Sequence, residues 1–126
     1  MASHIELGKW GEELAADLLE RKGMRILERD WRSGHRDIDI VARTADELVF
    51  VEVKTRESDA FGNPWESVDW RKRKNLLASI NQYIRSRRID MPFRFDIISV
   101  ILSNPEQPQI EHIENVQLVS TGSYCR

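Results

Sequence analysis

Three charged side chains stand inside two apolar runs, where buried strands normally carry no charge. Asp39 lies in a run at residues 38–41, and Glu52 and Lys54 lie in a second run at 49–54. Because side chains alternate along a strand, Glu52 and Lys54 would share one face. A buried carboxylate is costly unless it is paired or binds a metal. Two carboxylates and a lysine on one sheet would suit a divalent-cation site that hydrolyses phosphodiesters.

A tight hairpin with its tip at Ala45-Asp46 would bring the two runs together. Residues whose numbers sum to 91 would then face each other, so Asp39 would lie opposite Glu52. Directly opposed residues have Cβ atoms ~5 Å apart, close enough to share an ion. Ala-Asp is not a favoured hairpin turn, and a slip of one residue would move Asp39 to the other face. In the alternative interpretation, Glu52 and Lys54 form an ordinary surface ion pair.

A predicted helix over residues 5 to about 22 offers a further carboxylate. Its apolar residues recur with helical spacing at Leu7, Trp10, Leu14 and Leu18. At 100° per residue, Glu12 falls instead beside small and apolar residues, which would point its carboxylate towards a sheet. In the alternative interpretation, Glu12 lies at the rim of the apolar stripe and reaches solvent.

The remaining patterns predict an α/β fold, a mixed β-sheet flanked by helices in the order α-β-β-β-α-β-β. We expect one domain over residues 1–126, with residues 119–126 as a C-terminal tail. Trp31, Ser33 and Gly34 are expected in a loop, and Trp10 and Tyr83 in the core. Besides the hairpin strands, the expected elements are strands at 24–28, 93–102 and 110–116, a loop at 57–66 and a helix at about 68–87.

Positive charge is concentrated in one segment of an acidic chain. The 126 residues have a formal net charge of −2, yet residues 71–89 contain seven Lys or Arg and no acid. Such a segment is typical of a nucleic-acid-binding surface, although a solvated helix face explains the charge equally well. We assign phosphate contacts to Arg56, Lys72, Arg73 and Lys74. The sequence shows neither a signal-peptide pattern nor a bilayer-spanning stretch, so we expect a cytoplasmic protein without a membrane partner.

Several segments resemble motifs of a known superfamily. A Gly-x-x-Gly-Glu-x-x-Ala helix is matched at Gly8, Gly11, Glu12 and Ala15. A Gly-Glu-Ile-Asp-Leu-Ile-Ala strand is matched at residues 36–42, with Arg36 and Asp37 replacing Gly-Glu. Phe-Val-Glu-Val-Lys-Thr-Arg is intact at 50–56, and a later lysine and an Arg-Phe-Asp strand match Lys72 and residues 94–96. The chain thus resembles the PD-(D/E)xK superfamily of restriction-endonuclease-like nucleases, and within it the bacterial YraN-type family, similar to archaeal Holliday-junction resolvases.

The resemblance implies a restriction-endonuclease-like fold and a role for each site residue. Asp39, Glu52 and Lys54 would be the catalytic triad, with Glu12 as an additional catalytic residue. Asp39, Glu52 and Glu12 would bind Mg²⁺, or Mn²⁺ in its place. The expected activity is an endonuclease acting on branched or structured DNA, and a homodimer is left open. The alternative is a non-catalytic module that binds nucleic acid or a protein partner and keeps the fold.

Two further features carry expectations of their own. Asp96 lies in an apolar strand and is expected to support Lys54 or an arginine. Trp31, Trp65 and Trp70 could stack on unpaired bases, with core packing the expected role of two of them.

Overall fold

The computed structural model describes residues 3–34, 36–58 and 70–118, and within these it has the predicted α/β order. The elements are α1 (His4–Arg21), β1 (Arg25–Ser33), β2 (Arg36–Arg43), β3 (Leu48–Arg56), α2 (Trp70–Ser86), β4 (Phe93–Ile101) and β5 (Gln109–Ile113). The described strands form one five-stranded sheet in the order β1-β2-β3-β4-β5. β3 and β4 are parallel and the other neighbours antiparallel, so the sheet is mixed, as expected.

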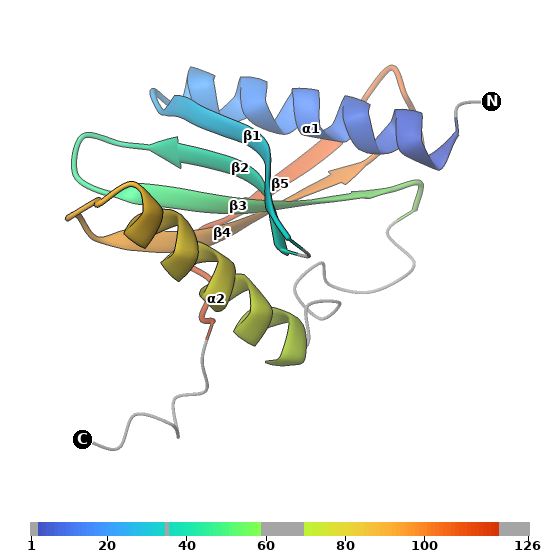
Figure 1. The fold of residues 1–126 in the computed structure, drawn as a ribbon. Helices are drawn as coiled ribbons and strands as arrows, with labels where there is room; N and C mark the ends of the chain where they lie inside the picture. Colours follow the sequence, from blue (N-terminus) through green and yellow to red (C-terminus); the bar gives the residue numbers. More distant parts are fainter. Residues whose placement is uncertain (1–2, 35, 59–69, 119–126) are drawn as a thin grey trace.

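The two described helices cover opposite faces of this sheet (Figure 1). Against one face pack Leu76, Ile80 and Tyr83 of α2, and the Tyr83 side chain is buried, as predicted. Ala15, Ala16 and Leu19 of α1 pack against the other face. β3 is therefore covered on both sides, which explains its almost continuous apolar sequence. Neither described helix is long and apolar enough to cross a membrane.

The most buried side of α1 is lined mainly by small residues, and the predicted leucines Leu7, Leu14 and Leu18 are only partly buried beside it. Ser3 caps the helix, its Oγ accepting from the Glu6 amide at 3.1 Å. Gly11, Ala15, Ala16 and Leu19 are buried, whereas Trp10 is 37% exposed. The prediction that Trp10 lies in the core is wrong, because small side chains let the helix approach the sheet along a different stripe.

Gly11 makes the closest approach of α1 to β3 possible. A Cβ atom added at Gly11 would overlap the hydroxyl of Thr55, whereas one added at Gly8 would meet no atom within 4 Å. This contact places the first half of α1 directly over the end of β3. Glu12, the next residue, is thereby held at the sheet.

β1 is longer than predicted and includes Trp31 and Ser33, which were expected in a loop. Its pairing with β2 shifts register between Ile26 and Glu28, and Asp30 has a left-handed backbone with φ of 51°. These two irregularities interrupt the alternation of polar and apolar residues that identifies a strand. Trp31 packs against the α2-side core, its ring 5.4 Å from that of Tyr83.

The other predicted elements lie within three residues of their expected ends. Asp96 of β4 is completely buried and supports an arginine, one of its two expected roles: the Arg94 guanidinium donates to its carboxylate at 3.1 Å. His112 Nε2 lies 2.7 Å from the same carboxylate, and the Asn115 amide donates to it at 2.9 Å. Most of the predicted 57–66 loop with Trp65, and the predicted 119–126 tail, lie outside the described residues.

Candidate active site

The β2–β3 hairpin has the predicted register, and Asp39 lies where its pairing ends. The Thr44 amide donates to the Glu47 carbonyl at 2.9 Å around the Ala45-Asp46 tip. The four paired positions sum to 91, ending at Ile40 opposite Val51. At the next position, the Val53 amide donates to Asp39 Oδ2 at 2.8 Å. The Asp39 side chain thus takes the place of a backbone acceptor where the two strands separate.

Asp30 is a site carboxylate that the sequence interpretation missed. Arg29 pairs with Ile40 and Trp31 with Ile38, so Asp30 lies opposite Asp39 across β1 and β2. The expected end of the first strand at residue 28 left Asp30 in a loop, with no partner assigned to it. The same kind of counting that paired Asp39 with Glu52 would have paired Asp30 with Asp39, if the first strand had been extended.

Three carboxylates from three elements converge at this point. Single oxygens of Glu12 on α1, Asp30 on β1 and Asp39 on β2 all lie within 4.8 Å of one another. Glu12 therefore lies beside β1 and β2 of the sheet, as predicted, and is partly buried there. Glu52 is not part of this close group among the described residues, but its charge acts on the Asp39 carboxylate.

The convergence of acids raises two pKa values. Burial, together with the charge of Asp30 and a hydrogen bond to it, raises the pKa of Glu12 to about 7. Burial and the charge of Glu52 raise the pKa of Asp39 to about 7, against the hydrogen bond from the Val53 amide. Both carboxylates therefore hold protons near neutral pH more readily than usual, because burial and neighbouring negative charge disfavour their ionised forms.

Glu52 is held by two lysines beside the carboxylate group. Lys54 Nζ lies 3.1 Å and Lys72 Nζ 2.9 Å from the same oxygen, Glu52 Oε2. Lys54 comes from β3, as predicted, and Lys72 reaches over from α2. Burial, followed by the neighbouring Lys72 ammonium, lowers the pKa of Lys54 despite the attraction of Glu52.

The donor set fits one divalent cation. Carboxylate oxygens are the ligands that Mg²⁺ and Mn²⁺ prefer. Four carboxylates against two ammonium groups leave a formal net charge of −2, which one such ion would neutralise. Burial first, and then the charges of neighbouring carboxylates, raises the pKa of Glu12 and of Asp39. Glu12, Asp30 and Asp39 could hold the ion directly, and Glu52 lies beside them.

The basic residues assigned to phosphate contacts have different surroundings. Lys72 pairs with Glu52, and Arg73 donates to the Gln117 carbonyl at 2.9 Å while lying 4.7 Å from the centre of the exposed Trp70 ring. Lys74 is exposed and Arg56 half-buried.

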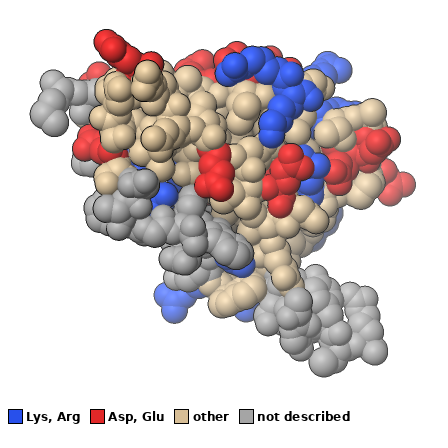
Figure 2. Space-filling model, turned by 180° about the vertical axis from the view of Figure 1, so that it is seen from behind, with Lys and Arg blue, Asp and Glu red and all other residues tan. Residues whose placement is uncertain are grey.

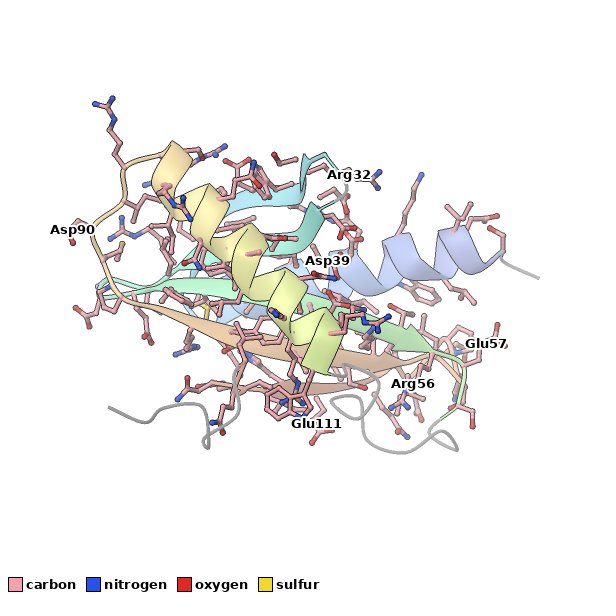
Figure 3. The ribbon with its side chains drawn as sticks, turned by 60° about the horizontal axis from the view of Figure 1, so that its bottom comes forward. Arg32, Asp39, Arg56, Glu57, Asp90 and Glu111 are labelled. Carbon is pink, nitrogen blue, oxygen red and sulfur yellow. The ribbon has the colours of Figure 1, made fainter. Side chains whose placement is uncertain are left out.

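Figure 3 shows Asp39 towards the end of the molecule where α2 begins, with Arg32 and Arg56 at that end and Asp90 at the other.

We expect the stability of the metal-free protein to fall as pH rises through about 7. Glu12 and Asp39 have raised pKa values in the folded state, so the folded protein binds more protons than the unfolded chain between about pH 4 and pH 7. Their contribution is complete below about pH 4 and is lost on ionisation, a change of about 2 kcal/mol or more. Thermal unfolding in EDTA from pH 5 to pH 8 measures it.

Mg²⁺ should raise the melting temperature of the protein more at pH 8 than at pH 5, because binding of the ion requires ionised carboxylates. The double variant Glu12→Gln, Asp39→Asn should lose both the metal effect and this part of the pH slope. A double variant with the slope of the wild type would show that other groups cause it.

The fold and site together define a small α/β protein with an acid and lysine cluster where two strands of its sheet separate. Residues 11–100 match the model of a family described as "Uncharacterised protein family UPF0102", and the chain belongs to this family. A UPF0102 protein of Porphyromonas gingivalis is 47% identical over 91% of this chain and 86% of its own length. One from Bacteroides thetaiotaomicron is 47% identical over 90% of this chain and 93% of its own length. One from Rhodococcus opacus is 40% identical over 91% of this chain and 98% of its own length.

Proposed function

We propose that this protein is a Mg²⁺-dependent endonuclease of the PD-(D/E)xK type that cuts branched or otherwise structured DNA. The observation that carries the proposal is the convergence of Glu12, Asp30 and Asp39 on one point, beside the Glu52–Lys54 pair. The resemblance of residues 36–56 to the superfamily motif supports the assignment of the reaction. Mn²⁺ would serve in place of Mg²⁺, since both prefer oxygen ligands.

Each side chain has a separate part in this proposal. Glu12, Asp30 and Asp39 would hold the ion, with Glu52 as a further ligand. A bound divalent cation would polarise the scissile phosphate and lower the pKa of the attacking water. Lys54, whose pKa is lowered by burial and by Lys72, would orient that water by hydrogen bonding. Its ammonium charge would also offset the negative charge that grows on the phosphate as the bond forms.

The exposed side of α2 is the surface on which we place the DNA backbone. Arg71, Lys74 and Arg85 are exposed and fall within about 60° of one another around the helix. A hollow beside them is lined by Ala78, Asn81, Gln82, Arg85 and Ser86. On the upper half of the face that Figure 2 presents, by contrast, Lys and Arg side chains lie among Asp and Glu. Arg71, Lys74 and Arg85 are named here the α2 basic stripe.

Reversing charge in the α2 basic stripe should weaken DNA binding irrespective of sequence. The double variant Arg71→Glu, Lys74→Glu should lose at least about tenfold in affinity, and its dependence on salt concentration should flatten. Fluorescence anisotropy with a labelled branched DNA over a salt series measures both. The matched control is Lys22→Glu, Arg25→Glu, far along the chain and away from α2. Equal losses of DNA affinity in the two double variants would show that the effect depends on the net charge of the protein and not on the position of the α2 basic stripe.

The proposal is tested by incubating the protein with branched, flapped and single-stranded DNA in Mg²⁺ or Mn²⁺. Endonucleolytic cuts in at least one of these substrates, abolished by EDTA, are expected. The alternative function, a non-catalytic binding module, is favoured by binding to these DNAs without cleavage in either metal. The raised pKa values of Glu12 and Asp39 predict that cleavage is faster at pH 8 than at pH 6.

A further inference from the structure

Glu52 makes an unusual pair of contacts for a metal-binding carboxylate. Two ammonium groups approach the same oxygen, Glu52 Oε2, from different elements, Lys54 at 3.1 Å and Lys72 at 2.9 Å. The Glu52 side chain is only 12% exposed. Most of its capacity to neutralise a cation is therefore already used within the protein, even though it lies beside the carboxylates that could hold a divalent ion.

The two lysines differ in how readily they could leave. Lys54 lies on the central strand β3, two residues from Glu52, and its side chain is 22% exposed. Lys72 belongs to the first turn of α2, and its side chain is 42% exposed. A divalent cation beside Asp39 would repel both ammonium groups. Lys72 has the more exposed of the two side chains, so it is the one with more solvent to move into.

We propose that Lys72 is a displaceable counter-ion of Glu52, released when a divalent cation binds. In the metal-free protein Lys72 neutralises Glu52, and an entering cation takes over this carboxylate and frees the Lys72 ammonium for a DNA phosphate. The site would thus present this charge to DNA chiefly after metal has bound. This inference rests on the proposed function, since it requires a divalent cation at the Asp39 cluster.

The test is the affinity for Mn²⁺ at pH 8 without DNA, measured by electron paramagnetic resonance of free Mn²⁺. Lys72→Met removes the competing charge and keeps much of the side-chain volume, so Mn²⁺ should bind about five- to twentyfold more tightly. Lys74→Met is the matched control, because Lys74 is an exposed lysine two residues away on another side of α2. It should change the affinity by no more than about twofold. Lys72→Arg keeps the charge and should also remain within about twofold of the wild type.

The direction in which Lys72→Met changes the Mn²⁺ affinity distinguishes the possible outcomes. A lysine that merely positions Glu52 would give weaker Mn²⁺ binding in Lys72→Met, and this result, or an unchanged affinity, overturns the inference while leaving the proposed function intact. Wild-type protein without saturable Mn²⁺ binding would instead overturn the proposed function and the inference together.

The release of Lys72 towards DNA has its own measurement. Anisotropy of a labelled branched DNA is compared in EDTA and in Ca²⁺, a divalent ion that carboxylates also bind. Lys72→Met should lower DNA affinity at least about threefold more in Ca²⁺ than in EDTA, because only the metal-bound protein offers Lys72 to a phosphate. Equal losses in the two conditions would overturn this part of the inference.

Discussion

Asp39→Asn should abolish metal-dependent DNA cleavage while leaving the protein folded. The substitution removes one carboxylate charge from the Glu12, Asp30 and Asp39 group that we propose holds the ion. The amide oxygen can still accept the hydrogen bond from the Val53 amide, which Asp39 Oδ2 accepts at 2.8 Å. We expect the rate to fall by more than about 10³-fold, a loss of about 4 kcal/mol of transition-state stabilisation. Single-turnover cleavage in Mg²⁺ is the measurement, and circular dichroism reports the fold.

Asp37→Asn is the matched control for this experiment. Asp37 lies two residues earlier on β2, is exposed and is outside the close carboxylate group. It should retain cleavage within a fewfold of the wild type. DNA affinity without metal should hold or rise in Asp39→Asn, because one negative charge near the phosphates is removed. Cleavage that survives Asp39→Asn would point to a contaminating nuclease or to another site.

Gly11→Ala should destabilise the protein and impair cleavage, although alanine normally favours a helix. The added Cβ would overlap the hydroxyl of Thr55, so α1 must move away from β3 or Thr55 must shift. Overpacking of this kind costs about 1–3 kcal/mol, which exceeds the gain of up to about 1 kcal/mol from helix propensity. Movement of α1 would also carry Glu12 away from Asp39, and a misplacement of about 1 Å can cost about 10²-fold in rate.

Two variants make this prediction decisive. Gly8→Ala lies on the same helix, and its Cβ meets no atom within 4 Å. It should stabilise the protein by about 0.5–1 kcal/mol. Adding Thr55→Ala to Gly11→Ala removes the overlapped hydroxyl and should restore part of both stability and cleavage. Urea unfolding and cleavage rates measure the two effects, and equal stabilities of Gly8→Ala and Gly11→Ala would show that the close approach has no energetic consequence.

In the β2–β3 hairpin, local sequence patterns predicted the strand register correctly. Asp39, Glu52 and Lys54 stand out because charge interrupts apolar strands, and the register follows from counting outward from the Ala45-Asp46 tip. The register is confirmed by the four paired positions up to Ile40 and Val51. Local counting works here because the two strands are joined by a short turn, so no long-range packing is needed to set their alignment.

In the group of Glu12, Asp30 and Asp39, local sequence patterns did not predict every member or the way in which α1 packs. Asp30 was missed because a register shift and a left-handed residue conceal the end of β1 in the sequence. The burial of Trp10 was predicted wrongly because the helix stripe with the largest side chains is not the one that packs closest. Close approach at Gly11 depends on Thr55, a residue far along the chain, and no helical periodicity contains that information.

The sequence by itself determined the element order, the hairpin register and the acids and lysine of the central strands. These depend on periodicity and on short connections, which are local properties of the chain. Only the tertiary structure decided that Asp30 joins Glu12 and Asp39, and that Lys72 of α2 contacts Glu52 of β3. The physical reason is that these side chains come from separate elements, and the packing of both helices on the sheet sets their distances.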